Sequence, residues 1–253
     1  MKNLHTLFTG QTHLHLPECP STNDYASDLL AEIQPAEGTV ITARSQTAGR
    51  GQVGRGWESA PGQNLTMSVI LYPKFLSAAR QFDLNIAVSL AVFAVVEQYA
   101  ADVTVKWPND IYVGNKKIAG ILIRNTVSGQ NLQSAVVGIG LNVNQKIFLS
   151  NAPNPTSLLT ETGKKSEPLH LCADICTFLE KYYLQLKSGY AADLRRLYLQ
   201  HLYRVGHPFT FQRTADASYF TGIITRVTSA GKIVIDTETG LETFSLKEVR
   251  FCP

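Results

Sequence analysis

Residues 106–122 read KWPNDIYVGNKKIAGIL. This stretch and its flanks contain three short runs rich in strand-favouring residues, at residues 103–107, 111–113 and 117–124. Gly114 and Asn115 are typical of the tight turn that joins two antiparallel strands. The stretch therefore predicts a hairpin that returns the lysine pair 116–117 beside the strand that carries Asp110.

Pro108 fixes a bend at a strand end within this stretch. We expect the bend to take Asn109 and Asp110 out of the strand ladder, so that both present their side chains. An Asp that faces a Lys across a hairpin is most often a surface ion pair of little energetic value. The flanking W-P-N motif nevertheless favours a functional role for the pair of Asp110 and Lys117 over a chance surface contact.

The larger part of the chain, to about residue 203, alternates strand-like runs with helical patterns. Further strands are predicted at residues 38–44, 65–72 and 135–143, and an edge strand with His13 and His15 on one side. Helices are predicted at residues 25–33, 82–99, 169–186 and 191–203, the first capped by residues 21–24. Because the strands cluster in hairpins with few strict βαβ alternations, the expected fold class is α+β and not a Rossmann fold.

From Gly206 onward the sequence has only short β-type runs separated by turn residues. This change in composition predicts a small all-β barrel at the C-terminus. We therefore expect two domains, residues 1–203 and residues 204–253.

Composition and charge exclude several classes of protein. The 253 residues carry a formal net charge of +3, a surplus too small for the electrostatic footprint of a nucleic-acid binder. The most apolar run, residues 86–96, is too short to span a bilayer and predicts a core helix. The first twenty residues have no long apolar core, so a signal peptide is not expected.

Four cysteines stand at positions 19, 172, 176 and 252 without a C-x-x-C pair. This spacing favours free thiols in a reducing compartment, so we expect a cytoplasmic protein. Cys172 and Cys176 share one face of a predicted helix and could bind a metal. Two buried small hydrophobic residues are the better interpretation.

Residues 49–57 read GRGQVGRGW and form a second motif. Glycines let the backbone approach an anion, and arginines add forked charge, so the segment suits a phosphate. It is neither a Walker loop nor a dinucleotide fingerprint, because no G-K-[ST] and no helix follow. Taken alone, a solvated hairpin tip explains it equally well.

Residues 137–144 read VGIGLNVN, a strand whose glycines leave room for a ligand or another backbone. Asn142 and Asn144 would lie on one face and could recognise amide or base edges. The glycines are explained equally well by packing, since they would relieve crowding between a helix and the sheet. This segment alone therefore does not establish a binding site.

Taken in order, five motifs resemble the biotin protein ligases. They are S-T-N at 21–23, Q-x-A-G-R-G-x-x-G-R-x-W at 46–57, K-W-P-N-D at 106–110, K-I-A-G-I-L at 117–122 and G-I-G-L-N-V-N at 138–144. The resemblance covers essentially the whole chain. It implies an α+β domain with a mixed sheet like that of class II aminoacyl-tRNA synthetases, followed by a small SH3-like barrel.

The resemblance also implies the reaction. Biotin and MgATP first give biotinyl-5′-AMP and pyrophosphate, and a specific lysine of a biotin carboxyl carrier protein or domain then takes the biotinyl group. Such chemistry needs charge neutralisation at the α-phosphate, retention of a labile anhydride and a deprotonated amine. Biotin, ATP and Mg²⁺ are thus the implied substrates and cofactor, and the carrier domain of a biotin-dependent carboxylase is the implied partner.

The implied roles of individual residues follow from the matching motif positions. Biotin contacts fall on Ser21, Thr22, Gln46, Gly49, Arg50, Lys117, Gly120, Gly138 and Gly140. Contacts to ATP and the adenylate fall on Arg50, Arg55, Trp57, Asn109, Lys117 and Asn142. The implied catalytic residues are Lys117 for developing charge, Asp110 for the incoming amine and Arg50 for phosphate.

Two departures from the family pattern matter. Gln52 stands where the family often has a second arginine. The resemblance therefore leaves open how tightly the loop binds the adenylate. The S-T motif begins at Ser21, which leaves no room for the DNA-binding domain of bifunctional members, so a ligase without repressor function is expected. We expect no DNA and no membrane partner; the metal ligands and the oligomeric state, monomer or weak dimer, stay open.

Two alternative functions stay open beside this one. A lipoate ligase or lipoyl transferase has a related fold, but its usual R-R-x-S-G-G-G-x-V-x-H segment is absent. A catalytically silent biotin-binding protein would lack the lysine or the carboxylate of the site. Both Lys117 and Asp110 are present.

Overall fold

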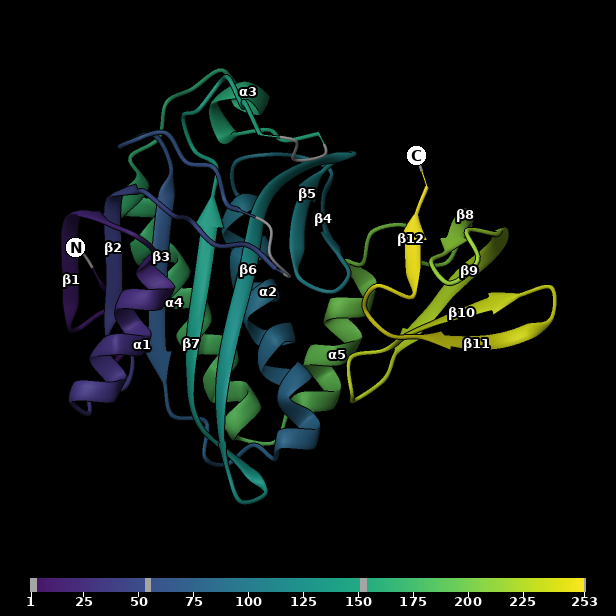
Figure 1. The fold of residues 1–253 in the computed structure, drawn as a ribbon, viewed down its shortest axis with the longest axis horizontal. Helices are drawn as coiled ribbons and strands as arrows, with labels where there is room; N and C mark the ends of the chain where they lie inside the picture. The colour runs from purple at the N-terminus through teal and green to yellow at the C-terminus, as the bar shows by residue number, and fades with distance from the viewer. Residues whose placement is uncertain (1–3, 53–55, 151–153, 253) are drawn as a thin grey trace.

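The computed structural model describes residues 4–52, 56–150 and 154–252. Its larger sheet has seven strands in the order β1-β2-β3-β7-β6-β5-β4 (Figure 1). The strands are β1 (His13–Cys19), β2 (Val40–Gln46), β3 (Leu65–Leu71), β4 (Val103–Lys106), β5 (Asp110–Val113), β6 (Lys116–Ser128) and β7 (Asn131–Leu141). All strands predicted in this region are confirmed, with ends that shift by a few residues.

Only β1 and β2 pair in parallel, and the other neighbours are antiparallel. The parallel pair is connected through α1 (Thr22–Glu32), as a parallel connection requires a crossover. Helix α1 begins three residues before the predicted Tyr25, because the Ser21 hydroxyl accepts a hydrogen bond from the backbone N–H of Asp24. The predicted α+β fold class is confirmed.

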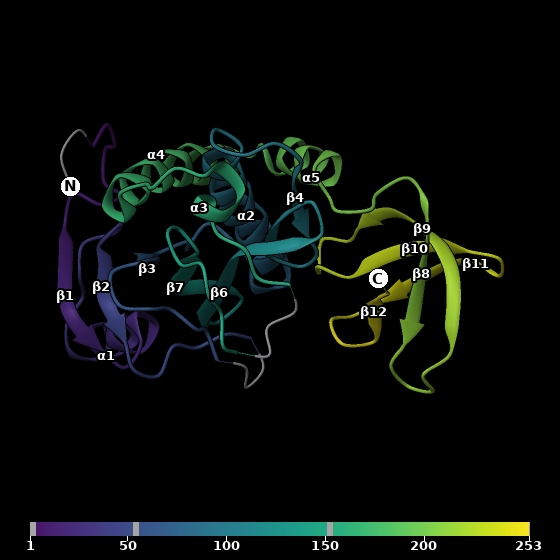
Figure 2. The same cartoon turned by 90° about the horizontal axis from the view of Figure 1, so that it is seen from above.

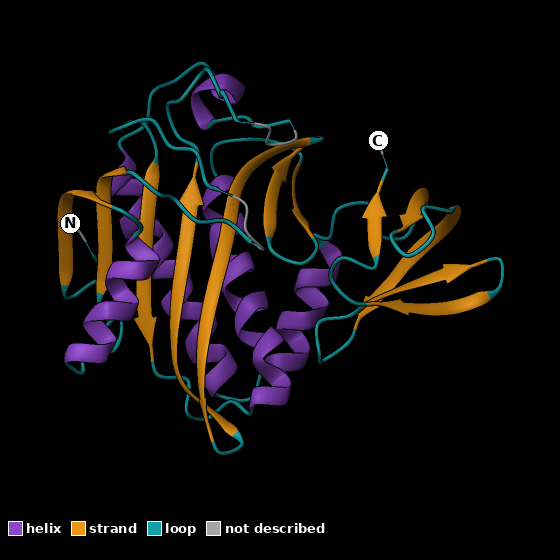
Figure 3. Cartoon of the chain, viewed as in Figure 1, coloured by secondary structure: helices purple, strands orange, loops and turns teal. Residues whose placement is uncertain are grey.

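The two faces of this sheet are covered differently. Helices α2 (Gln81–Val96), α4 (Pro168–Lys187) and α5 (Ala191–Gln200) lie on one face, and α1 lies on the other (Figures 2 and 3). Helix α1 lies mainly over β2, β3 and β7, and its side chains Asn23 and Asp24 reach the adjoining part of this face at β6. That part of the sheet carries the motifs predicted to form a site.

Helix α2 is the predicted core helix. Residues 78–96, which include a 3-10 turn at Ala78–Arg80, are long and apolar enough to cross a membrane by length and composition. Most of this segment is nevertheless buried between the sheet and α4, which is the setting of a core helix in a globular protein. Cys172 and Cys176 are fully buried in the same core, as predicted.

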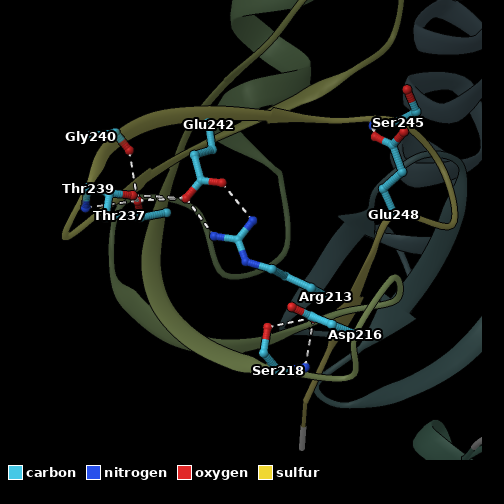
Figure 4. Close-up of polar contacts among 9 residues, drawn as sticks. All are labelled: Arg213, Asp216, Ser218, Thr237, Thr239, Gly240, Glu242, Ser245 and Glu248. Atoms are coloured by element: carbon cyan, nitrogen blue, oxygen red, sulfur yellow. Dashed lines mark hydrogen bonds and ion pairs between the residues drawn. The ribbon is translucent and has the colours of Figure 1, made fainter.

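The C-terminal region forms a five-stranded antiparallel sheet in the order β11-β10-β9-β8-β12. Its strands are β8 (Pro208–Arg213), β9 (Tyr219–Val227), β10 (Ile233–Thr237), β11 (Gly240–Phe244) and β12 (Val249–Phe251). Arg213 of β8 makes two hydrogen bonds, of 2.6 and 2.7 Å, to the carboxylate of Glu242 on β11 (Figure 4). These strands are not neighbours in the sheet, so the ion pair curls the sheet toward a barrel.

The two sheets share one continuous hydrophobic core. Across the junction, the indole N–H of Trp107 donates to the carbonyl of Gly231 at 2.9 Å. The ring of Tyr203 lies 6.2 Å from that of Phe251, centroid to centroid. The boundary between residues 203 and 204 stays a prediction, because packing is continuous across it.

Two local expectations need correction. Asp110 does not leave the strand ladder: it is the first residue of β5, opposite Lys106 on β4 and Gly120 on β6. The bend at Pro108 lies in the connection between β4 and β5, before Asp110. Helix α3 (Leu158–Thr162) was not expected, although Ser157 caps it and Gly163 ends it in the left-handed conformation.

Candidate active site

The pair Lys117 and Asp110 lies at the start of the β5–β6 hairpin. The Lys117 ammonium is 2.7 Å from the Asp110 carboxylate, and both side chains are partly exposed. The turn at Gly114 has a φ of +55°, which glycine adopts readily. A bulge at Ile118 of β6 then places Lys117 opposite Tyr112, on the same face of the sheet as Asp110. The predicted return of the lysine beside Asp110 is confirmed.

Backbone pairing holds Lys117 from its other side. Its N–H donates to the carbonyl of Asn154 at 2.8 Å, and its carbonyl accepts from the N–H of Thr156 at 2.9 Å. The neighbouring Lys116 turns away and forms an ion pair of 2.8 Å with Glu161 on α3. Two adjacent lysines therefore have different partners, and only Lys117 faces Asp110.

The Trp57 ring packs against the strands beside this pair. A Cβ added at Gly140 would collide with the ring, and one at Gly120 would lie 3.1 Å from it. Lys117 Nζ lies 5.8 Å from the ring centroid. The indole nitrogen of Trp57 is buried without a hydrogen-bond partner among the described residues. In this conformation, the two glycines make room for an aromatic side chain.

The two described ends of the loop before Trp57 pair with each other. The N–H of Trp57 donates to the carbonyl of Gly49 at 2.9 Å, and Arg50 pairs with Gly56. The Arg50 guanidinium lies 2.6 Å from Asp24 on α1. Arg55 lies outside the described residues, so its role stays a prediction.

Asp24 binds a second arginine as well. Its other carboxylate oxygen accepts from Arg124 of β6 at 2.6 Å. Burial disfavours the charge on Asp24, but the hydrogen bonds from Arg50 and Arg124 outweigh it and lower the pKa of this carboxyl. One carboxylate thus joins the loop arginine to both α1 and the sheet.

A cluster of uncharged polar groups lies at the N-terminus of α1. Gln46 accepts a hydrogen bond from the backbone N–H of Thr22 at 2.8 Å. Ser68 Oγ lies 2.8 Å from the Thr22 hydroxyl and 2.7 Å from the Asn23 amide oxygen. Ser21, Thr22 and Asn23 are all buried. The cluster offers neutral donors and acceptors in a desolvated setting.

Asn23 also explains one of the predicted glycines. Its amide nitrogen donates to the carbonyl of Leu122 at 3.0 Å, and a Cβ at Gly138 would collide with its side chain. The sequence motif S-T-N contains Asn23, but the contact needs β6, β7 and α1 together. No spacing in the sequence predicts it, and the same holds for Ser68.

Asn109 and Asn142 are both buried. The Asn109 amide nitrogen donates to the Ile121 carbonyl at 2.7 Å, and that of Asn142 donates to the Thr156 carbonyl at 2.9 Å. The amide oxygen of Asn142 is buried without a partner among the described residues. Asn109 therefore has a structural partner already, whereas Asn142 has an acceptor to spare for a ligand.

Lys106 begins the K-W-P-N-D motif, but the sequence predicted no role for its side chain. Its ammonium lies 4.6 Å from the ring centroid of Tyr112, 5.7 Å from Tyr203 and 5.4 Å from Phe251. Burial lowers its pKa, Asp110 opposes this, and positive neighbours lower it further. This aromatic surrounding joins the site hairpin to the C-terminal sheet.

Comparison with known proteins identifies the family. The sequence pattern of the biotin/lipoate A/B protein ligase family matches residues 16–142, which is half of the chain. The chain belongs to this family. It is 30% identical to the biotin--[acetyl-CoA-carboxylase] ligase of Paracoccus denitrificans, with 83% of this chain and 89% of the relative covered. It is 29% identical to the bifunctional ligase/repressor BirA of Bacillus spizizenii, with 94% and 74% covered.

Solved structures of the family agree with the fold. The biotin protein ligase from Aquifex aeolicus in complex with biotin and ATP superimposes with a TM-score of 0.79 at 26% identity. The match covers 96% of this chain and 100% of that one. The predicted resemblance to the biotin protein ligases is confirmed, as is the mixed sheet of the class II synthetase type. Which residues of this family member touch its ligands stays a prediction.

The described residues hold no group of three or more His, Cys, Asp or Glu side chains that could bind a metal ion. The Asp110 carboxylate of the candidate site is already paired with Lys117. Magnesium often keeps several waters and is held by substrate phosphates. A magnesium ion bound with ATP would need few protein ligands of its own.

Proposed function

We propose that this protein is an ATP-dependent biotin protein ligase. It activates biotin as biotinyl-5′-AMP and transfers the biotinyl group to a lysine of a biotin carboxyl carrier protein or domain. The observation that carries the proposal is the Lys117–Asp110 ion pair beside Trp57, on the sheet face whose other end holds an uncharged polar cluster. The names of the relatives support the same reaction.

Biotin is bound at the polar cluster. Its ureido ring is neutral and has both donors and acceptors, so the uncharged groups of Ser21, Thr22 and Gln46 match it without burying an unpaired charge. The cluster is desolvated, which strengthens each hydrogen bond made there. The resemblance assigns Gly49, Gly120, Gly138 and Gly140 to the biotin site as well. In this conformation the Trp57 ring occupies the space over Gly120 and Gly140, so biotin binding requires the ring to move.

In the first half-reaction, a carboxylate oxygen of biotin attacks the α-phosphorus of ATP, and pyrophosphate leaves. Negative groups approach one another in this step, so a positive group is needed between them. Lys117 supplies a compact ammonium that can follow the developing charge. Arg50 adds a second cation from the loop, and Asn142 offers its unpaired amide oxygen to the adenine side.

In the second half-reaction, a neutral amine attacks the biotinyl carbonyl carbon. An amide bond forms, the bond to the phosphate oxygen breaks, and AMP leaves with the electron pair. The attacking ammonium must first lose a proton. Asp110 is placed to orient the amine and to accept a hydrogen bond from it.

The partner is the carrier domain of a biotin-dependent carboxylase, as the names of the acetyl-CoA-carboxylase ligases suggest. The reaction consumes ATP, and the four cysteines are free thiols, so we place the protein in the cytoplasm. That it binds no DNA stays a prediction.

Incubation of the purified protein with ATP, biotin and a carrier domain tests the proposal. Mass spectrometry of the carrier should show one biotinyl group on one lysine, and omission of ATP should abolish it. The same mixture with lipoate in place of biotin should leave the carrier unmodified. Lipoylation without biotinylation would indicate a lipoate ligase, and biotin binding without modification would indicate a silent binding protein.

A further inference from the structure

Glu58 joins two loops that are far apart in the sequence. Its carboxylate accepts hydrogen bonds from the backbone N–H groups of Leu149, at 2.9 and 3.0 Å, and Ser150, at 2.7 Å. It also accepts from the side-chain amide of Gln145 at 3.0 Å. One carboxylate therefore serves three donors of the loop 145–150.

Both loops border the candidate active site. Glu58 directly follows Trp57, whose ring lies beside Lys117. The other loop follows the end of β7 at Leu141 and returns at Thr156, whose N–H donates to the carbonyl of Lys117. Glu58 thus connects the loop of residues 49–57 to a segment whose two ends are attached to the site.

Polar contacts, and not apolar packing, fix the loop 145–150. The side chains of Ile147 and Leu149 are 74% and 87% exposed. Gln145, in contrast, is buried and accepts from the N–H of Ala60 and from Asn64. Gln145 fixes the base of the loop, and Glu58 is the group that holds its far side.

Glu58 is ionised in this arrangement. Burial disfavours its charge, but the hydrogen bonds from Leu149, Ser150 and Gln145 outweigh burial and lower the pKa of the carboxyl. Backbone donors to a carboxylate make stronger hydrogen bonds than donors to a neutral amide. Replacement by Gln keeps the size of the side chain and removes the charge and one acceptor.

We propose that Glu58 is a positioning residue that couples the loop 145–150 to Trp57 beside Lys117 and thereby prepares the nucleotide side of the site. The inference rests on the proposed function for the identity of the nucleotide. A loop that is held before ATP arrives loses less conformational freedom on binding, so ATP affinity depends on Glu58. The biotin contacts expected at Thr22 and Arg50 have hydrogen bonds of their own, to Gln46 and Asp24, so biotin affinity depends much less on Glu58.

The first test needs no substrate. Lys146 is an exposed trypsin site inside the loop 145–150. In the ligand-free protein, Glu58→Gln should raise the rate of cleavage after Lys146 about fivefold, because the loop opens more often. The matched control is Glu248→Gln, since Glu248 also caps a backbone N–H, that of Ser245 at 2.6 Å, in the C-terminal sheet. An unchanged cleavage rate in Glu58→Gln would overturn the proposal.

The second test separates the two substrates. Glu58→Gln should raise KM for ATP about tenfold in biotin-dependent pyrophosphate exchange, while Kd for biotin stays within about twofold. A merely structural defect would weaken both, and that result would contradict the coupling. If the wild-type protein shows no biotin-dependent exchange, the proposed function fails, and the proteolysis test still decides whether Glu58 holds the loop.

Discussion

The Lys117 ammonium and the Asp110 carboxylate lie 2.7 Å apart, although the two residues are not directly opposite in the β5–β6 ladder. A bulge at Ile118 of β6 shifts the register between Ile111 and Tyr112, and this places Lys117 on the face of the sheet that carries Asp110. A positive and a negative group therefore lie side by side on this face of the sheet. A cation for the phosphate step and a carboxylate for the amine step can then act on the same intermediate.

Asp110→Asn should separate the two half-reactions. We expect transfer from preformed biotinyl-AMP to the carrier lysine to slow about 100-fold, because the amine loses the carboxylate that orients it. Pyrophosphate exchange should slow by less than about tenfold, since Lys117 keeps its charge. Rapid-quench transfer and exchange assays measure the two steps. Asp193→Asn, which removes an exposed ion pair to Arg196, is the control; equal losses in both steps would argue against a role in transfer.

Gly140→Ala should destabilise the fold through Trp57. A Cβ there collides with the indole ring, so we expect the free energy of unfolding to fall by about 1–3 kcal/mol. The same substitution in a Trp57→Ala background should cost much less, because the ring is gone. Urea unfolding of the four proteins completes this double-mutant cycle. Additive effects would show that the ring does not occupy the space over Gly140.

Gln52→Arg should slow the release of biotinyl-AMP. A neutral Gln cannot make the bidentate, charged contact of an arginine, so this ligase is expected to lose its intermediate faster than arginine-containing relatives. A chase of preformed biotinyl-AMP from wild type and variant measures release directly. Equal rates would mean that Arg50 and the adenine-side loop already control retention.

Glu242→Gln should destabilise the C-terminal sheet in a pH-dependent way. Hydrogen bonds from Arg213 outweigh the opposing effect of burial and lower the pKa of Glu242 from 4.5 to about 2. Because the folded-state pKa is the lower one, this stabilisation is present above pH 4.5 and is lost as the pH falls toward about 2. We expect the variant to lose about 1 kcal/mol near neutral pH and to approach wild type at about pH 3. A difference that persists in acid would mean that packing, and not charge, explains the loss.

The strands and helices could be predicted because their signals are local. Short runs of apolar and β-branched residues mark β6 and β7, and the apolar run in residues 86–96 marks α2. The return of Lys117 to Asp110 could be predicted for the same reason, since a short hairpin fixes it.

Contacts between distant segments could not be predicted. The hydrogen bonds of Glu58 to residues 149 and 150, and the aromatic surrounding of Lys106, join groups more than ninety residues apart in several cases. The prediction that the bend at Pro108 takes Asp110 out of the ladder was wrong for a related reason. Pairing with β4 and β6 on both sides keeps Asp110 in the ladder despite the proline nearby.

Lys117→Ala compared with Lys116→Ala tests the central claim most directly. The two lysines are adjacent, but Lys117 faces Asp110 and Trp57, whereas Lys116 pairs with Glu161 at 2.8 Å. The measurement is biotin-dependent ATP–pyrophosphate exchange, with circular dichroism as the control for folding. The account predicts that Lys117→Ala loses at least about 100-fold in exchange rate and that Lys116→Ala stays within about threefold of wild type. Near wild-type exchange in a folded Lys117→Ala protein would contradict it.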